Sequence, residues 1–214
     1  MSPDLREIYD RFADTYEANR GLFDMTGILG PFFTSLEQPE GRLLDLGCGA
    51  GEPFPRYFLE HGWEVVGVDF SKKMLRLAAF YAPRMHTIYA DMTTVEFEPG
   101  TFDAITCIYS LFHVPCALHP DLFAKFRRWL RLGGKVLFTY ATAAYTGHEE
   151  FEGTLEFMGQ RLFYSHTTPD QLRAQLRAAG LAVESFCYRE IGGETFLWVV
   201  ASRPATPPPV RTPS

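Results

Sequence analysis

Basic residues, secretion signals and long hydrophobic runs are all scarce in this sequence. The 26 aspartate and glutamate residues outnumber the 20 lysine and arginine residues, giving a net charge of −6. A nucleic-acid-binding protein with a basic face is therefore not expected. No apolar run reaches the roughly 18 residues of a membrane-spanning helix, and no signal peptide is visible. We predict a cytoplasmic protein that binds neither nucleic acid nor membrane.

Cysteine pairs and metal-binding patterns are also missing. The four cysteines are Cys48, Cys107, Cys116 and Cys187. They form no CxxC pair and no metal-ligand spacing, so reduced and mostly buried thiols are expected. His113 and His119 lie six residues apart with Pro115 between them, which gives no metal geometry. We therefore predict that the protein holds no metal.

The chain is long and apolar enough for one large domain, with 214 residues of which 46% are hydrophobic. Strand-like runs alternate with helical patterns as far as residue 180. Strands are expected at residues 42–47, 64–70, 86–91, 102–110 and 135–142, and helices at 52–62, 71–82, 120–134 and 168–180. Two last strands, 181–190 and 195–202, flank an Ile-Gly-Gly turn and predict a hairpin. This order favours an α/β fold with a mostly parallel sheet, helices on both faces and an antiparallel last strand.

A glycine-rich loop follows the first predicted strand, in the stretch LLDLGCGAGEP of residues 43–53. Gly47, Gly49 and Gly51 remove Cβ atoms where the backbone approaches a ligand or takes a positive φ. The next strand ends in Asp69, 24 residues after Asp45. A carboxylate there can accept hydrogen bonds from both hydroxyls of a ribose. The loop and the acid together predict a site for an adenosine-type nucleotide.

Other nucleotide-binding motifs do not fit. A nicotinamide site would read GxGxxG, but here the third glycine comes one residue early. No tyrosine has a lysine four residues later, as a short-chain dehydrogenase would require. The GKS or GKT of a phosphate-binding loop is absent as well.

The segment from Tyr9 to Ala201 resembles the class I S-adenosylmethionine-dependent methyltransferases of the small single-domain type. The similar motifs are LLDLGCGAG, VVGVDFSKKML, YADM, FDAITCIYSLFHV and LRLGGKVLFTY, where Leu132 replaces the family's usual proline. The resemblance implies a Rossmann-like, doubly wound sheet of seven strands. It also implies S-adenosylmethionine as the cofactor and S-adenosylhomocysteine as its product.

The resemblance further implies roles for individual residues. Asp69 would bind the ribose, Asp91 the adenine amino group, Met92 the adenine ring edge through its backbone, and Ile108 the methionyl amine through its carbonyl. The remaining cofactor-binding candidates in this domain are Asp45, Gly47, Cys48, Gly49, Gly51 and Phe70.

Residues 1–40 resemble the family's N-terminal cap helices, ahead of a cofactor-binding domain at 41–202. In the cap, Tyr16 and Arg20 would close over the methionyl end, with Tyr9 near the substrate, although packing on the core explains such residues equally well. Residues 203–214 are rich in proline and predict an exposed tail.

Methyl transfer needs a base only if the acceptor loses a proton. His113, just after the fourth strand, is the first candidate and His166 the second, because a histidine pKa near 6.5 suits neutral pH. Each is also explained as a wall or capping residue. The segment 140–166 is rich in aromatics and predicts an acceptor site for a small hydrophobic or aromatic molecule, unless it is only a packing hairpin. Its substrate-lining candidates are Tyr140, Tyr145, Phe163 and Tyr164.

The predicted function is methyl transfer to an oxygen or nitrogen atom of a small molecule. Two alternatives remain open. One is an enzyme of the same fold that uses the cofactor for another reaction, such as aminopropyl transfer or a pericyclic step. The other is a non-catalytic subunit that binds the cofactor and supports a partner enzyme. The intact glycine, ribose and adenine motifs weigh against this last alternative.

Overall fold

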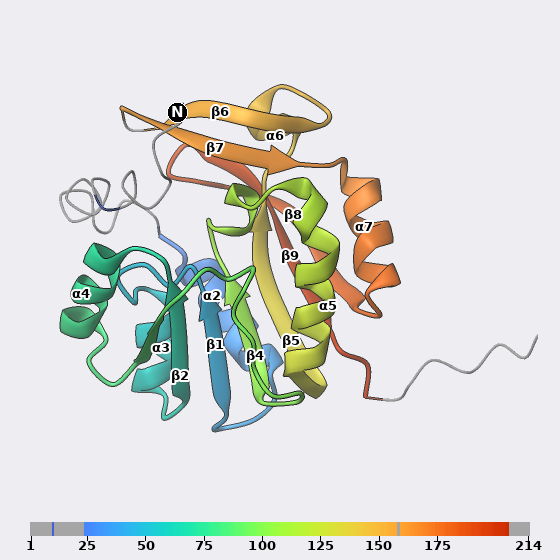
Figure 1. Cartoon of the computed structure of the whole chain (residues 1–214). Coiled ribbons are helices and arrows are strands. Elements are labelled where there is room, and N and C mark those ends of the chain that lie inside the picture. The colour runs from blue at the N-terminus through green and yellow to red at the C-terminus, as the bar shows by residue number, and fades with distance from the viewer. Residues whose placement is uncertain (1–9, 11–23, 158, 206–214) are drawn as a thin grey trace, which may run out of the picture.

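A seven-stranded sheet forms the centre of the computed structural model, which describes residues 10, 24–157 and 159–205 (Figure 1). In chain order, the elements are α2 (Thr26–Ser35), β1 (Arg42–Leu46), α3 (Phe54–Glu60), β2 (Glu64–Asp69), α4 (Lys72–Tyr81), β3 (His86–Tyr89), β4 (Phe102–Cys107), η1 (Leu111–His113), η2 (Cys116–Leu118), α5 (His119–Trp129), β5 (Leu130–Tyr140), α6 (Ala143–Thr146), β6 (Phe151–Phe157), β7 (Gln160–His166), α7 (Pro169–Ala178), β8 (Ala182–Ile191) and β9 (Glu194–Ser202).

The strand order is β3-β2-β1-β4-β5-β9-β8. The first five strands pair in parallel, and β9 pairs antiparallel with both β5 and β8. The predicted α/β fold with an antiparallel C-terminal hairpin is confirmed. The order of the strands reverses between β1 and β4, and ligands bind at the carboxyl edge of such a switch point.

Local sequence signals set the ends of the main elements. The Ser71 hydroxyl accepts a hydrogen bond from the Met74 N–H and begins α4. Thr168 begins α7 in a reciprocal capping box with Gln171. Gly192 and Gly193 both have positive φ, at 63° and 82°, which is the turn geometry that a two-residue hairpin needs. These caps and the final hairpin agree with the predicted boundaries.

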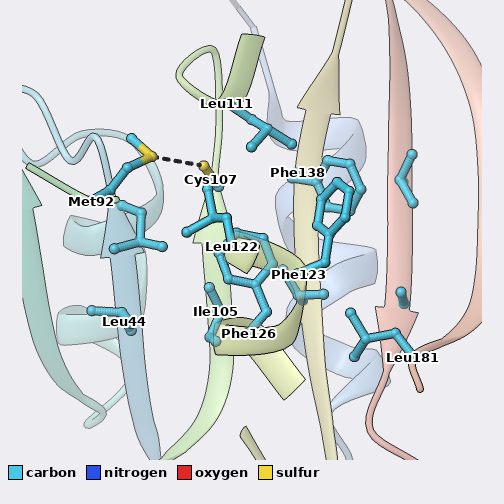
Figure 2. Close-up of a cluster of buried hydrophobic side chains, with 14 of the residues drawn as sticks. Leu44, Met92, Ile105, Cys107, Leu111, Leu122, Phe123, Phe126, Phe138 and Leu181 are labelled. Carbon is cyan, nitrogen blue, oxygen red and sulfur yellow. Dashed lines mark hydrogen bonds between the residues drawn. The ribbon is translucent and has the colours of Figure 1, made fainter. Parts of the chain in front are cut away.

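Two layers of helices cover the sheet, each over its own buried cluster. On one face α5 and α7 pack on β1, β4 and β5, as Figure 2 shows for Leu122, Phe123 and Phe126. On the other face, α2 and α3 contribute Phe32 and Phe58 to a second cluster. A continuous apolar layer on each face is what a largely parallel sheet requires. The layers leave the carboxyl edge of the sheet for loops and for one further hairpin.

Helix α5 ends earlier than the sequence pattern predicts. The stripe of apolar residues was expected to continue through Leu130 to Gly133 and Gly134, but α5 ends at Trp129. Leu130 is fully buried and already pairs with Phe102 as the first residue of β5. Tertiary pairing overrides the helical periodicity here because Leu130 buries its side chain equally well from a strand.

The predicted insert, residues 140–166, forms a short helix and a two-stranded hairpin. Strands β6 and β7 pair antiparallel, apart from the main sheet. In Figure 1 the hairpin lies across the carboxyl ends of β4 and β5. Its Leu162 and Tyr164 pack against Phe112 and Phe196 in a third apolar cluster. The hairpin therefore covers the edge where the switch-point rule places the ligand.

The described residues near both ends of the chain contact the central domain. Helix α2 falls within the predicted cap, residues 1–40, yet Leu29 and Phe32 pack into the main core. Arg203 was assigned to the exposed tail, but its guanidinium donates to the Leu130 carbonyl at 2.7 Å and its backbone bonds with Gly133 and Gly134. Residues 206–214, like 1–9 and 11–23, lie outside the described residues.

Two further findings concern the part of the chain that the structure describes. Within residues 24–157 and 159–205, no helix has the length and hydropathy needed to cross a membrane. Among the same residues, no three histidine, cysteine, aspartate or glutamate side chains come together as a group able to hold a metal ion.

Candidate active site

The glycine loop lies at the carboxyl end of β1 and is held by its backbone. The Gly47 and Cys48 N–H groups both donate to the Val68 carbonyl, at 2.8 and 3.1 Å. The Gly51 N–H then donates to the Cys48 carbonyl at 2.9 Å. These bonds fix a tight turn against the end of β2, and α3 begins three residues after Gly51.

The three glycines of this loop are required for different reasons. All have positive φ, between 51° and 80°. A Cβ at Gly47 would lie 2.4 Å from Ser110 Cβ, and one at Gly51 would lie 2.7 Å from Ala82 Cβ. A Cβ at Gly49 would meet no atom of the described residues within 4 Å. Gly47 and Gly51 therefore serve internal packing, while the bare backbone of Gly49 faces open space, as a ligand-contacting glycine should.

Asp69 closes this open space on the β2 side. Its carboxylate accepts the Gly49 N–H at 2.9 Å and the Ser71 N–H at 2.7 Å. Burial raises the pKa of Asp69 to about 6, against the lowering effect of these bonds. The Phe70 backbone also bonds to this carboxylate. A carboxylate offers about four acceptor positions, so a position remains that can accept a ribose hydroxyl.

A second carboxylate, Asp45, is buried in β1 beside the loop. Its oxygen accepts the Thr106 hydroxyl at 2.5 Å. Burial raises the pKa of Asp45 to about 7, and the nearby charge of Asp69 raises it further. Two desolvated carboxylates at one end of the sheet favour a cationic ligand. A sulfonium cofactor carries that charge.

The other cofactor-binding candidates gather at the same edge. Asp91 follows β3 and uses one carboxylate oxygen to accept the Thr93 N–H and hydroxyl. Met92 is buried, and in Figure 2 its sulfur lies against Cys107, at 4.0 Å from Sγ. Ile108 follows β4 and is half-buried. These residues lie where the resemblance requires them, and their contacts with a cofactor stay a prediction.

Cys48 takes part in the loop through its backbone. Its side chain is buried and its sulfur lies where a Cβ on Gly67 would approach it to 2.8 Å. Burial raises the pKa of its thiol well above the ordinary value. The side chain therefore seals the underside of the loop and is not a nucleophile. Phe70, the remaining candidate of this group, is half-buried directly after Asp69.

On the opposite side of the edge lies an aromatic cluster, formed by Tyr109, Phe112, Tyr145, Tyr164 and Phe196. Phe112 stacks on Tyr164 and Phe196, with ring centroids 5.3 and 4.9 Å away. Tyr145 lies 4.5 Å from the Phe196 centroid and Tyr109 lies 5.4 Å from it. Of the predicted lining residues, Tyr145 and Tyr164 belong to this cluster, in which aromatic rings from the turn after β4, η1, α6, β7 and β9 meet.

Two other predicted residues of the insert do not line the open edge. Tyr140 is fully buried, and its hydroxyl accepts the Thr167 N–H at 2.9 Å and contacts His119 Nδ1 at 3.3 Å. It belongs to the core beneath the hairpin, because the last residue of β5 still faces α5. Phe163 is half-buried, and its carbonyl, rather than its ring, makes the contact that matters for the site.

His113 is buried and its Nδ1 lies 2.6 Å from the Phe163 carbonyl. Burial lowers its pKa to about 4, against the raising effect of this hydrogen bond. The expected pKa near 6.5 is therefore wrong. At neutral pH the imidazole is uncharged and its Nδ1–H donates to the carbonyl, so the side chain joins η1 to β7.

His166, the second base candidate, is the last residue of β7 and pairs with Phe151 in the hairpin. Its Nε2 is 2.8 Å from the Thr146 hydroxyl and its Nδ1 is 3.2 Å from the Thr167 carbonyl. Burial lowers its pKa as well. Both ring nitrogens are engaged with α6 and the start of the next loop, so His166 stabilises the hairpin.

Some residues of the site carry no motif. Thr106 orients Asp45, and the Ser110 hydroxyl donates to the Leu46 carbonyl at 2.8 Å. Tyr109 has a φ of 52°, rare for a non-glycine residue. Asp10 accepts the Ser71 hydroxyl at 2.6 Å and so lies beside the same edge. Single residues of these types occur throughout proteins, so their part in the site is visible only in the folded structure.

The predicted cap residues Tyr9, Tyr16 and Arg20 lie outside the described residues.

Comparison with known families identifies the chain. A family model described as a methyltransferase domain matches residues 8–185. The chain belongs to this methyltransferase family, and its fold is that of the class I S-adenosylmethionine-dependent methyltransferases, which many solved structures share. The methyl donor of that class is S-adenosylmethionine, and the open face at Gly49 beside Asp69 fits its ribose.

Two relatives differ in the atom that their names say they methylate. The chain is 32% identical over 160 residues to phosphoethanolamine N-methyltransferase 1 of Triticum aestivum, a match that covers 72% of this chain and 31% of that protein. It is 30% identical over 152 residues to 27-O-demethylrifamycin SV methyltransferase of Amycolatopsis mediterranei, covering 67% of this chain and 55% of that protein. The chain thus spans about a third to a half of these relatives.

A solved structure shows that the same fold also belongs to an enzyme of another reaction type. The [4+2]-cyclase SpnF superposes with a TM-score of 0.71 at 16% identity, covering 94% of this chain and 96% of that one. At this identity the likeness concerns the fold alone.

Proposed function

We propose that this protein transfers the methyl group of S-adenosylmethionine to an oxygen or nitrogen atom of a small, hydrophobic or aromatic molecule. The observation that carries the proposal is the bare Gly49 backbone, open to a ligand and bonded to the Asp69 carboxylate at 2.9 Å. The family membership and the two relatives named for O- and N-methylation support it.

When bound, the cofactor supplies an electrophilic methyl on a sulfonium with a neutral leaving group. Asp69 would hold the ribose, with Asp91 and Met92 at the adenine and the Ile108 carbonyl at the methionyl amine. The protein's remaining task is to align the acceptor and exclude water. The aromatic cluster suits that task, because four of its rings are supplied by side chains on rigid elements: Phe112, Tyr145, Tyr164 and Phe196.

For proton removal we propose that His113 acts as a wall and not as the base. A pKa of about 4 makes it a weak proton acceptor near pH 7, and its Nδ1 already bonds to Phe163. The hairpin and His113 would then close the acceptor chamber on the side away from the glycine loop.

A second candidate function is a reaction that uses the fold without methyl transfer. The fold allows it, since the [4+2]-cyclase SpnF has the same fold over 94% of this chain. In that reading the glycine loop would still bind the cofactor, while the aromatic cluster would hold a substrate that rearranges on its own. The two candidate functions use the same site. They differ in whether the methyl group leaves the cofactor.

The test is methyl transfer from cofactor labelled in the methyl group. Purified protein is incubated with labelled S-adenosylmethionine and a panel of small phenols, alcohols and amines, and binding of S-adenosylhomocysteine is measured by calorimetry in parallel. We expect label in an organic product and binding of S-adenosylhomocysteine. Binding without labelled product on any acceptor would favour the second candidate, and no binding would refute both.

A further inference from the structure

Glu194 lies at the carboxyl edge of the sheet, at the first position of β9. Tyr140 ends β5 and pairs with Leu197, so Glu194 lies three residues beyond the end of β5 on the ligand side. Side chains alternate along a strand, and Glu194 therefore shares a face with Phe196 of the aromatic cluster. Glu194 is half-buried there.

Two tyrosines of the cluster lie near this carboxylate. The Tyr145 hydroxyl is close enough to Glu194 to lower the pKa of its carboxyl, and it donates to the Tyr164 hydroxyl at 3.2 Å. Glu194 also lies close enough to Tyr109 for its charge to raise the pKa of that phenol. Burial raises the pKa of Glu194 itself, against the lowering effect of Tyr145.

No cation is provided for Glu194 by residues 24–157 and 159–205. The ion pairs of these residues involve other carboxylates: Glu52, Glu60, Glu64, Glu96, Asp103 and Glu184. A half-buried carboxylate that the described residues leave without a positive partner costs free energy that a cationic ligand would recover. Aromatic faces around it add to the attraction, because they bind ammonium groups through their quadrupoles.

Tyr109 links this position to the methyl-donor side. It directly precedes Ser110, whose hydroxyl donates to the Leu46 carbonyl of β1 at 2.8 Å. The positive φ of Tyr109 turns its ring toward Phe196 and Trp198, at centroid distances of 5.4 and 5.8 Å. One turn of chain therefore contacts the start of the glycine loop at Ser110 and the cluster around Glu194 at Tyr109.

We propose that Glu194, with the rings of Tyr109, Tyr145 and Phe196, binds a positively charged ammonium group of the methyl acceptor. The inference rests on the proposed function, since it names the class of acceptor for the same site. It narrows that class to small aromatic or hydrophobic amines, in which the cationic group is held by Glu194 and the apolar part lies on the rings. The ammonium nitrogen must lose a proton before it attacks the methyl group, and the Glu194 carboxylate accepts that proton.

The test compares an amine with a neutral molecule of nearly the same shape. Phenethylamine and 2-phenylethanol are titrated calorimetrically into the protein in the presence of S-adenosylhomocysteine at pH 7.5. We expect the amine to bind at least about tenfold more tightly, as a charge-assisted contact in an aromatic setting implies. In Glu194→Gln the two should bind within about twofold of each other.

Glu190→Gln is the matched control, because Glu190 is an exposed carboxylate of the same hairpin, paired with Thr195. It should keep the preference for the amine. Tyr145→Phe should reduce the preference partly, by removing the hydroxyl that orients Glu194. Melting temperatures of all variants verify that the fold is retained.

Three results would overturn the inference. Wild-type protein that binds the alcohol as well as the amine, or neither of them, has no ammonium site. An unchanged preference in Glu194→Gln places the site elsewhere. A loss of S-adenosylhomocysteine affinity in Glu194→Gln assigns Glu194 to the cofactor. Failure of the wild type to bind S-adenosylhomocysteine would instead refute the proposed function. The amine and the alcohol would then be compared in the absence of S-adenosylhomocysteine.

Discussion

The two sides of the carboxyl edge are built in different ways. On the β1–β2 side, most of the groups predicted to face the cofactor are backbone amides and two buried carboxylates within residues 45–69. On the β5–β9 side they are aromatic side chains and one carboxylate, from Tyr109 to Phe196. A contiguous, backbone-built half specifies the shared cofactor, whereas a dispersed, side-chain-built half is free to change with the acceptor.

The strongest way to test this comparison is to add one methyl group to the glycine loop. We expect Gly47→Ala to destabilise the fold by roughly 2–5 kcal/mol, combining a left-handed backbone penalty with overpacking against Ser110. Gly49→Ala, whose added Cβ meets no atom of the described residues within 4 Å, should cost only about 1–2 kcal/mol of stability. Urea unfolding measures both changes.

For ligand binding we expect the opposite order: Gly49→Ala should lose more affinity than Gly47→Ala. A Cβ on Gly49 fills the space assigned to the cofactor, so folded Gly49→Ala should lose most of its affinity for S-adenosylhomocysteine by calorimetry. Equal stability losses in the two variants, or full affinity in Gly49→Ala, would contradict the division of roles within the loop.

The next largest effect concerns Asp69. Asp69→Ala should weaken S-adenosylhomocysteine binding by about 1.5–3 kcal/mol, typical of lost hydrogen bonds to a charged group. Asp170→Ala, at an exposed carboxylate on α7, serves as the control and should bind normally. Unchanged affinity in Asp69→Ala would remove the ribose assignment and with it the cofactor half of the comparison.

How much the sequence predicts follows the same division. The strands, the glycine loop and Asp69 were predictable because their signals lie close together and have one physical meaning. The end of α5 was not, since Leu130 satisfies a helical stripe and a strand position equally. Glu194 and Tyr109 were missed because their importance arises only when β9 and the turn after β4 meet. Tyr140 was assigned to the chamber wrongly, because a strand's last residue faces either side.

A smaller effect is the pH dependence of stability that the buried carboxylates on the glycine-loop side produce. Burial raises the pKa of Asp69 to about 6, above its ordinary value of 3.8. The native state thus holds more protons than the unfolded chain between pH 4 and 6. This group's contribution to the free energy of unfolding is therefore present below pH 4 and lost as the pH rises through 6.

Ribose hydroxyls that donate to Asp69 favour its charged form. Binding of S-adenosylhomocysteine at pH 6 should therefore release a fraction of a proton, and binding at pH 8 should release almost none. Calorimetry in buffers of different ionisation enthalpy measures the release. Proton uptake at pH 6, or the same release in Asp69→Ala, would show that the ribose does not bond to this carboxylate.

The smallest effect is expected at His113, which joins η1 to β7 on the aromatic side. A general base would lose about 10²–10⁴-fold in kcat on substitution. A wall residue that donates to the Phe163 carbonyl at 2.6 Å should tolerate His113→Asn, because an asparagine amide can still donate. We expect kcat to fall less than about tenfold, with no inflection between pH 6 and 7 in the wild-type profile, since burial lowers the pKa of His113 to about 4.

The contribution of His113 to stability depends on pH in the opposite direction to that of Asp69. With a native pKa of about 4 and an ordinary value of 6.5, His113 binds protons mainly in the unfolded chain between these values. Its contribution to the free energy of unfolding is thus lost as the pH falls from 6.5 to 4, and His113→Asn should flatten that decline. His86→Asn, at an exposed histidine of β3, should not. A large loss of kcat with an unchanged stability profile would make His113 a base after all, and the aromatic half would then supply chemistry as well as shape.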